Sequence, residues 1–418
     1  MTKKNLCYAQ SGGPTAVINA SAQGVIETAR KHHDKIDKIF AGLNGISGIL
    51  SENLIDTAYE SDEAITALGY TPGAAFGSCR YKLKDPKTQK EQYDRLFEIL
   101  DAHNIGYFLY NGGGDSQDTI HKISEYAKEK GYPLQCIGVP KTIDNDIPLT
   151  DTCPGYGSAA KFIATATRET YFDLRSMAAS STKVFILEVM GRHTGWLAAA
   201  SGLARETEED PPHIILMPEV AFDEDKFLNT VRAYKEKYGL CHIVVSEGAR
   251  DHNGHFLFNV NAKDAFGHTR LGGVAPTIAH MIKEKLDLKY HWAVANYMQR
   301  AARHIASKTD VELAYAVGKA AVEFALEGQT AVIPVIIRES ASPYQWYIES
   351  ANLSDVANQE HLVPADFITE NGFGITDKCR EYLSPLIQGE VPPPFHQGLP
   401  AYVKLKNQLV EKKILATV

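Results

Sequence analysis

The sequence predicts an α/β protein built from two doubly wound, mostly parallel sheets. Short runs of the chain are almost continuously apolar, as strands buried on both faces are. These runs span residues 134–140, 183–190, 213–219, 241–248 and 291–297. Longer segments with helical periodicity separate them, at residues 157–178, 224–239 and 310–328. In sheets of this kind, ligands bind beyond the carboxyl ends of the strands.

The length of the chain favours more than one domain. At 418 residues it exceeds the size at which a single hydrophobic core usually stops growing, so two α/β domains are the natural expectation. The pattern of strands and helices weakens after Ile337, and three consecutive prolines follow at residues 392–394. We therefore add a C-terminal cap extension with an irregular tail to the predicted fold.

Composition and charge exclude several classes of protein. Hydrophobic residues make up 44% of the chain, and the net charge of −8 without a dense basic block argues against binding to nucleic acid. No apolar run is long enough to span a bilayer. The six cysteines are scattered without a CxxC pair, which is typical of reduced thiols in the cytoplasm. We expect a soluble cytoplasmic protein with no membrane or nucleic-acid partner.

Glycine-rich turns follow predicted strands at several points. The turn SGGPT at residues 11–15 lies between a strand and a helix, and so does NGGGDSQDT at residues 111–119. Glycines let the backbone approach a phosphate, whose charge the N–H groups of the turn and of the helix N-terminus stabilise. A third turn presents Arg192, whose guanidinium can grip phosphate oxygens. One such turn alone would also suit a tight connection, but together they indicate a phosphate site.

The run PKTIDND at residues 140–146 is the most informative stretch of the chain. Asp144 and Asp146 lie two residues apart, so one can act as a base while the other helps to hold a metal ion. Lys141 supplies positive charge for an anionic substrate that the two acids would otherwise repel. The pattern fits phosphoryl transfer. Its alternative is an ordinary loop, because Asp and Asn favour turns through local hydrogen bonds.

These elements resemble the phosphofructokinases, a family whose members use either ATP or pyrophosphate. The matching motifs occur in the family's order. They are SGG at residues 11–13, GSCR at 77–80, GGGDS at 112–116, PKTIDND at 140–146, VMGRHTGW at 189–196, SEGA at 246–249 and YMQR at 297–300. The resemblance implies a pyrophosphate- and magnesium-binding domain at residues 1–150, a domain that binds fructose 6-phosphate at 151–337, and the cap extension at 338–418.

The resemblance also implies a reaction, a reversible step of glycolysis and gluconeogenesis that phosphorylates the C1 hydroxyl of fructose 6-phosphate. The catalytic residues it implies are Asp144 as general base, Lys141, Thr142 and Arg192. Its pyrophosphate site comprises Gly12, Gly13, Arg80, Gly113, Asp115, Ser116 and Lys141. Its fructose 6-phosphate site comprises Thr142, Asp144, Asp146, Lys183, Met190, Gly191, Arg192, Glu247, Tyr297 and Arg300. The cofactor Mg²⁺ is assigned to Asp115 and Asp146.

Two positions bear on the phosphoryl donor. The family's ATP users resemble one another in carrying GGDG and PGTIDND, whose glycines leave space for the nucleotide. Here Asp115 stands at the last glycine of the first motif, and Lys141 stands at the glycine of the second. The Asp115 carboxylate would repel an α-phosphate, whereas Lys141 can reach the leaving phosphate. Because Gly114 replaces the family's metal-binding aspartate, Asp115 is assigned both tasks, and pyrophosphate is the favoured donor.

Several alternatives stay open on the sequence alone. They are an ATP-dependent 6-phosphofructokinase, a relative that uses sedoheptulose 7-phosphate, and a non-catalytic regulatory chain of the same fold. Lys183 and His291 occupy places where the family often has an arginine, and a lysine keeps the charge but loses bidentate geometry. Since the family's residue at the place of Lys183 reaches into a neighbouring subunit's site, the resemblance implies a homodimer or a homotetramer.

Overall fold

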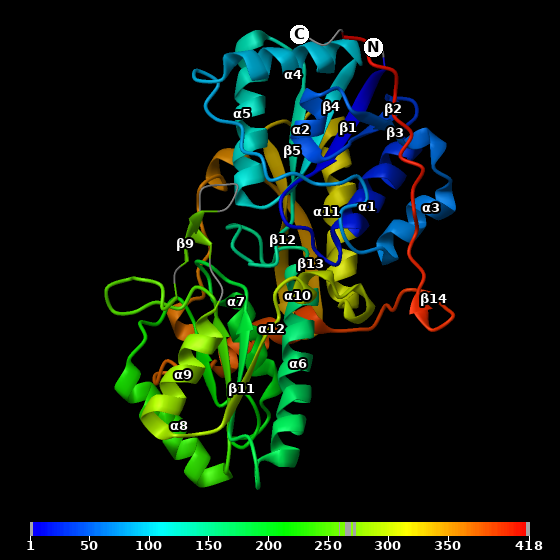
Figure 1. The fold of residues 1–418 in the computed structure, drawn as a ribbon. Coiled ribbons are helices and arrows are strands. Elements are labelled where there is room, and N and C mark those ends of the chain that lie inside the picture. The colour runs from blue at the N-terminus through cyan, green and yellow to red at the C-terminus, as the bar shows by residue number, and fades with distance from the viewer. Residues whose placement is uncertain (1–2, 259, 264–268, 271–272, 415–418) are drawn as a thin grey trace.

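The computed structural model describes residues 3–258, 260–263, 269–270 and 273–414, which form two α/β domains in contact with each other (Figure 1). Within these residues, the strands form a seven-stranded sheet, a four-stranded sheet and two short two-stranded pairs. The fold class predicted from the sequence is confirmed. The short pairs are β9 (Val260–Lys263) with β10 (Thr269–Arg270), and β14 (Phe395–His396) with β15 (Leu399–Pro400).

The first domain is built on the seven-stranded sheet, with the order β13-β12-β5-β4-β1-β2-β3. Neighbours from β12 to β2 run parallel, whereas the edge strands β3 and β13 are antiparallel. The strands are β1 (Lys4–Gln10), β2 (Ile36–Gly42), β3 (Leu54–Asp56), β4 (Ile105–Gly112), β5 (Gln135–Pro140), β12 (Val332–Ala341) and β13 (Tyr344–Asn352). The helices are α1 (Ile18–Lys31), α2 (Gly45–Leu50), α3 (Asp62–Ala67), α4 (Lys90–Ala102), α5 (Gly114–Lys130) and α11 (Lys308–Leu326).

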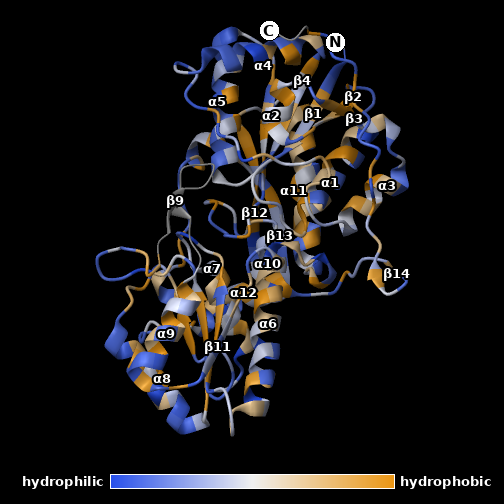
Figure 2. Cartoon of the chain, in the orientation of Figure 1, coloured by the Kyte–Doolittle hydropathy of each residue, from blue (hydrophilic) through white to orange (hydrophobic). Residues whose placement is uncertain are grey.

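Both faces of this sheet are buried, which explains its continuously apolar strands. In β1, Leu6 and Tyr8 belong to the core on the side of α1 and α11, and Cys7 and Ala9 belong to the core on the side of α4 and α5. Successive side chains of a strand point to opposite faces, so a strand covered on both sides needs apolar residues at every position. Figure 2 shows the hydrophobic residues concentrated on the strands and the hydrophilic ones on the outer helices and loops.

The second domain is built on an all-parallel sheet with the order β11-β6-β8-β7. Its strands are β6 (Val184–Val189), β7 (Ile214–Leu216), β8 (Cys241–Ser246) and β11 (Tyr290–Val294). Its helices are α6 (Tyr156–Met177), α7 (Trp196–Ser201), α8 (Glu224–Tyr238), α9 (Val274–Leu286), α10 (Met298–Ala301) and α12 (Asp377–Leu383). The cores on the two faces are formed with α6, α7 and α12 on one side and with α8 and α9 on the other.

The chain returns to the first domain after completing the second sheet. Helix α11 packs closely on α1, where a Cβ at Gly24 would lie 2.3 Å from the carbonyl oxygen of Tyr315. Strand β12 then pairs with β5 and with β13. These pairings revise the predicted domain ranges, because residues 338–352 belong to the first sheet and not to a cap. Strand β13 alternates between more and less exposed positions, so it lacks the continuous apolar run by which the other strands were found.

The remaining C-terminal residues connect the two domains. Helix α12 packs on the second domain, and the final described residues run along β3, seen as the red segment beside the first domain in Figure 1. The amide of Asp56 donates to the carbonyl of Gln408 at 3.0 Å, and the amide of Val410 donates to that of Leu54 at 2.9 Å. This segment therefore covers the edge of β3, which would otherwise offer unpaired backbone groups.

Two further expectations concern the cysteines and helices that could span a membrane. The six cysteines all lie in the described residues and are free thiols, as predicted. Among the helices that the structure describes, none is long and apolar enough to cross a membrane.

Candidate active site

A cavity of about 910 Å³ lies between the two domains, at the carboxyl ends of strands from both sheets. The first domain contributes the turns after β1, β4 and β5, and the second contributes the ends of β6, β8 and β11. The structure brings most of the predicted site residues together here. They are Gly12, Gly13, Arg80, Gly113, Asp115, Ser116, Lys141, Thr142, Asp144, Asp146, Met190, Arg192, Glu247, Tyr297 and Arg300.

The turn after β1 needs its glycines because basic side chains approach it closely. A Cβ at Gly13 would lie 2.3 Å from Nη1 of Arg300, so no other residue fits without displacing the guanidinium. Gly12 has φ of +73°, which favours glycine. The ammonium of Lys141 donates to the carbonyl of Gly13 at 2.7 Å. The predicted phosphate turn is therefore surrounded by positive charge, to which Arg80 also contributes.

The turn after β5 holds the predicted base in a fixed place. The amide of Asp144 donates to Oγ1 of Thr142 at 3.0 Å, and Oγ1 of Thr194 donates to the carbonyl of Asp144 at the same distance. The next residue, Asn145, is in the left-handed region with φ of +55° and is buried. Thr194 lies in the second domain, so the backbone of the base is held from both domains.

Burial and the neighbouring positive charges have opposite effects on the pKa of Asp144 in this turn. Burial and the nearby Arg300 lower the pKa of Lys141 to about 7. Burial raises the pKa of Asp144, and the positive charges of Lys141, Arg192 and Arg300 oppose that rise. A carboxylate with a raised pKa is a stronger base than an exposed one, and the cations help to keep it ionised. The surroundings of Asp144 therefore suit proton abstraction.

The part of the cavity wall formed by the second domain carries a half-buried acid, Glu247. Burial and the charge of Asp144 raise the pKa of Glu247 to about 7. The guanidinium of Arg300 lies 3.9 Å from the ring centroid of Tyr297, which orients it beside the cavity. Met190 lines the same region. This arrangement offers a hydroxyl acceptor and a phosphate-binding group to one ligand.

The proposed magnesium ligands differ in how well they suit a cation. One carboxylate oxygen of Asp146, Oδ1, is buried without a hydrogen-bond partner, and such an oxygen is available to a cation. Asp115 instead pairs with Lys82 at 2.6 Å, so an ion there would share the carboxylate with an ammonium. No group of three or more His, Cys, Asp or Glu suited to a metal occurs in the described residues. Magnesium commonly uses one or two carboxylates together with substrate phosphates, so the residues present fit it.

Lys82 is a site residue that the sequence reasoning missed. Besides its pairing with Asp115, its ammonium lies 3.9 Å from Asp118, and it lines the cavity. Only its position two residues after Arg80 could have indicated a role. Its charge offsets the acids at the N-terminus of α5.

The C-terminal region contributes a further part of the cavity wall that no motif indicated. Residues 358–360 line the cavity, and Glu360 lies 2.5 Å from Nδ1 of His193. The amide of His361 donates to the carbonyl of Asp146 at 2.8 Å, and the amide group of Asn358 donates to Asp118 at 3.2 Å. This segment, which we call the 358–361 segment, contacts the catalytic turn and both domains.

Two predicted residues are not part of the cavity lining. Gly191 lies between the lining residues Met190 and Arg192, with φ of +134°, and shapes the turn through its backbone. Lys183 lies just before β6, at the amino end of the sheet, and donates to the carbonyls of Ala178 and Ala179. The cavity opens at the carboxyl ends, so Lys183 cannot take part in the site of its own chain.

Sequence and structure comparisons identify the family of the chain. The phosphofructokinase family model matches residues 5–325, and the chain belongs to that family. The chain is 60% identical over 414 residues to the pyrophosphate–fructose 6-phosphate 1-phosphotransferase of Halomonas elongata, covering 99% of both. It is 58% identical over 417 residues to the protein of the same name from Methylococcus capsulatus, covering 100% of this chain and 99% of the relative. The family resemblance found in the motifs is confirmed.

A solved structure is similar over the whole chain. It is the crystal structure of pyrophosphate-dependent phosphofructokinase from Marinobacter aquaeolei, with a TM-score of 0.91 and 60% sequence identity. The alignment covers 99% of this chain and 98% of that chain. The arrangement of the two domains is therefore shared with that protein.

We predict that Lys82→Met raises the KM for the phosphoryl donor about tenfold, since a charge-assisted contact contributes about 1.5–3 kcal/mol. The KM for the sugar phosphate should change little, because Lys82 lies beside Asp115 and not on the sugar side. Steady-state kinetics with each substrate varied in turn measure both constants. Lys84→Met is the matched control, because Lys84 is exposed and does not line the cavity. Equal effects of the two variants would contradict the role given to Lys82.

Proposed function

We propose that this enzyme transfers a phosphoryl group from pyrophosphate to the C1 hydroxyl of fructose 6-phosphate, giving fructose 1,6-bisphosphate and phosphate. The observation that carries the proposal is the buried ammonium of Lys141, which lies between the glycine turn after β1 and the base Asp144. A compact, highly charged donor suits this crowded group of cations. The names of the relatives from Halomonas elongata and Methylococcus capsulatus support the same donor and acceptor.

The transfer can be written with each residue in a role. The carboxylate of Asp144 accepts the C1 hydroxyl proton as the sugar oxygen forms its bond to phosphorus. The bridging P–O bond of pyrophosphate breaks, and its electron pair stays on the leaving phosphate, whose charge Lys141 stabilises. Arg192 lines the cavity near the transferred group and stabilises charge that develops on it. Magnesium bound at Asp146, and at Asp115 alongside Lys82, would neutralise charge on the donor.

Fructose 6-phosphate is positioned by the second domain in this proposal. Arg300 and Tyr297 hold the 6-phosphate, and Glu247 accepts a sugar hydroxyl, while Met190 borders the sugar. A sugar hydroxyl is a natural partner for a half-buried acid, because an unpartnered carboxylate in that place costs free energy. The same groups would accept another ketose phosphate of similar length, so the acceptor assignment rests on the relatives' names.

The acidic residues at the proposed pyrophosphate site bear on the choice between pyrophosphate and ATP. Asp115 lies in the first turn of α5, and Asp118 lies one turn further on. Lys82 pairs with the first and lies near the second. A nucleotide's α-phosphate placed near these carboxylates would be repelled by their charge. This repulsion disfavours the ATP-dependent alternative.

We further propose that the enzyme is a cytoplasmic homodimer. Strand β11 is an edge of its sheet, and Trp292 on it is 45% exposed. Nearby in the chain, Tyr297 and Met298 are 59% and 61% exposed. An edge strand with large exposed apolar side chains is a natural place for a second copy of the chain. The free cysteines support the cytoplasmic location.

Wild-type protein should form fructose 1,6-bisphosphate from fructose 6-phosphate with magnesium and pyrophosphate, and much more slowly with ATP. Lys141→Gly should weaken use of pyrophosphate without creating efficient use of ATP, because Asp115 still blocks the nucleotide. Asp115→Gly alone should also impair pyrophosphate use. Only the double variant opens a route to ATP, and the two effects should be non-additive, because the residues share one site. Initial rates with each donor measure this. Wild-type rates that are equal with both donors would overturn the donor assignment.

Asp144→Asn should lower kcat by at least about a hundredfold, the usual scale for the loss of a general base. The KM for fructose 6-phosphate should change much less, since the amide keeps the size of the side chain. Steady-state formation of fructose 1,6-bisphosphate gives both constants, and thermal unfolding checks that the variant is folded. Near-full turnover would remove Asp144 from the mechanism.

Trp292→Glu should shift the protein from dimer towards monomer, because a carboxylate on the edge strand disfavours a buried interface. Light scattering during size-exclusion chromatography measures the mass. Tyr347→Glu is the control, since Tyr347 is 46% exposed on the edge of the other sheet. If Trp292→Glu leaves the mass unchanged and Tyr347→Glu lowers it, the interface lies on β13 and the proposed surface is wrong.

A further inference from the structure

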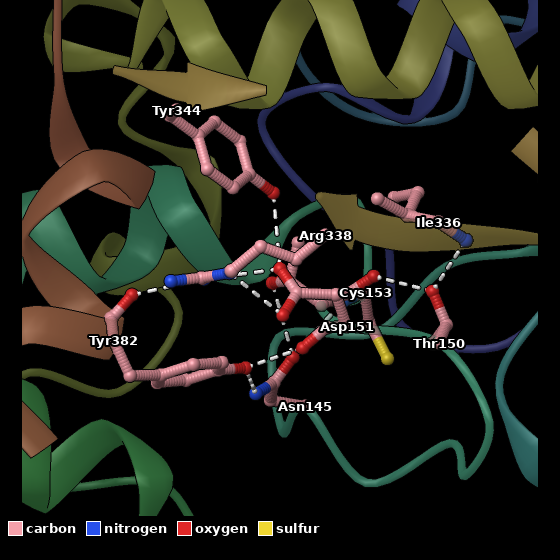
Figure 3. Close-up of polar contacts among 9 residues, drawn as sticks. Asn145, Thr150, Asp151, Cys153, Ile336, Arg338, Tyr344 and Tyr382 are labelled. Carbon is pink, nitrogen blue, oxygen red and sulfur yellow. Dashed lines mark hydrogen bonds and ion pairs between the residues drawn. The ribbon is translucent and has the colours of Figure 1, made fainter. Parts of the chain in front are cut away.

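Residues beyond the region that the family model matches contact the loop that carries the catalytic turn. The family match ends at residue 325, and the side chains of Arg338, Tyr344 and Tyr382 lie beyond it. Figure 3 shows these three side chains converging on the loop that carries Asn145 and Asp151. No motif in the sequence connects this part of the chain with the site.

Tyr382 contacts the catalytic turn at Asn145. Oδ1 of Asn145 accepts from the amide of Cys153 at 2.9 Å and from the hydroxyl of Thr152 at 3.2 Å. Its Nδ2 donates to the hydroxyl of Tyr382 at 2.9 Å. Asn145 is buried and has a left-handed backbone, which Asn adopts more readily than most residues because its short side chain can form local hydrogen bonds. Its neighbours along the chain are the base Asp144 and the candidate metal ligand Asp146.

Tyr382 is itself held in one position by several contacts. Its hydroxyl donates to the carbonyl of Asp151 at 2.5 Å, so its oxygen is left to accept from Asn145. The ring centroid lies 5.3 Å from that of Trp196, and the guanidinium of Arg338 lies 4.6 Å from the ring centroid. Arg338 also donates to both carboxylate oxygens of Asp151, at 2.9 and 3.0 Å. Because Tyr382 is fixed in this way, its hydroxyl holds the side chain of Asn145 in one position.

We infer that Tyr382 is a positioning residue for catalysis, which holds the base Asp144 in its productive orientation through the side chain of Asn145. The C-terminal region thus has a part in turnover, and not only in covering the first sheet. This inference rests on the proposed function, because it takes Asp144 as the base. A small displacement of a reacting group lowers the rate strongly while leaving substrate binding largely intact. Loss of the Tyr382 hydroxyl should therefore lower kcat and leave the KM values nearly unchanged.

Tyr382→Phe removes the hydroxyl and keeps the ring packing. It should lower kcat about tenfold while the KM values for both substrates stay within about twofold, as expected for misplacement of a reacting group. Tyr344→Phe is the matched control: its hydroxyl donates to the carboxylate of Asp151 at 3.0 Å and is not hydrogen-bonded to Asn145. Tyr382→Phe loses two hydrogen bonds and Tyr344→Phe loses one, so thermal unfolding of both variants checks that each is folded at the assay temperature. Equal kcat values for the two variants would overturn the inference.

A double-mutant cycle separates positioning from general destabilisation. In an Asn145→Ala background, Tyr382→Phe should lower kcat no further, because the path from Tyr382 to the base is already broken. Tyr344→Phe should have the same small effect in either background. Additive effects of Asn145→Ala and Tyr382→Phe on kcat would contradict the inference.

A measurement without turnover keeps this inference separable from the proposed reaction. Amide hydrogen exchange of residues 143–147, followed by mass spectrometry, should be faster in Tyr382→Phe than in wild type and unchanged in Tyr344→Phe. If the wild-type enzyme is inactive with fructose 6-phosphate and pyrophosphate, the proposed function is wrong. Faster exchange in Tyr382→Phe would still support the role of the contact between Tyr382 and Asn145. Unchanged exchange in Tyr382→Phe would overturn the inference whatever the activity.

Discussion

The buried ammonium of Lys141 is the group on which the catalytic cavity depends. It donates to the carbonyl of Gly13 at 2.7 Å, and the missing side chain of Gly13 leaves the space that Arg300 occupies. Burial and the charge of Arg300 lower the pKa of Lys141 to about 7, so these cations repel one another in the free enzyme. In a protein with a net charge of −8, such a cluster is best stabilised by an anion placed among its members. The substrate is that anion.

The base depends on the same cations. Burial raises the pKa of Asp144, and Lys141, Arg192 and Arg300 counteract that effect. A base shielded from water but kept ionised by fixed positive charge is well suited to abstract a hydroxyl proton. In the proposed reaction, the cations that bind the donor and the sugar phosphate therefore also set the protonation state of the base. One cluster of charges thus connects donor binding with activation of the sugar.

The sequence predicted most of the residues that line the cavity because these residues lie in local motifs. The turns after β1, β4, β5 and β6 are short stretches that are rich either in glycine or in charged residues. Lys82, the 358–361 segment and Tyr382 were missed because their contacts with the site are non-local and no pattern in their own neighbourhood indicates them. The return of β12 and β13 to the first sheet was missed for a related reason. An alternating edge hairpin has a weaker signal than a strand buried on both faces.

The catalytic turn is also one of the points where the chain passes from one domain to the other. It follows β5 in the first sheet and precedes α6 in the second domain. Contacts from both sides hold it, since Thr194 donates to the carbonyl of Asp144 and Arg338, on β12 beside β5, pairs with Asp151. A relative movement of the domains would strain this turn, because contacts with both domains hold it. The network around Tyr382 therefore opposes such strain where the base lies, which gives a physical reason for the C-terminal region to contact the site.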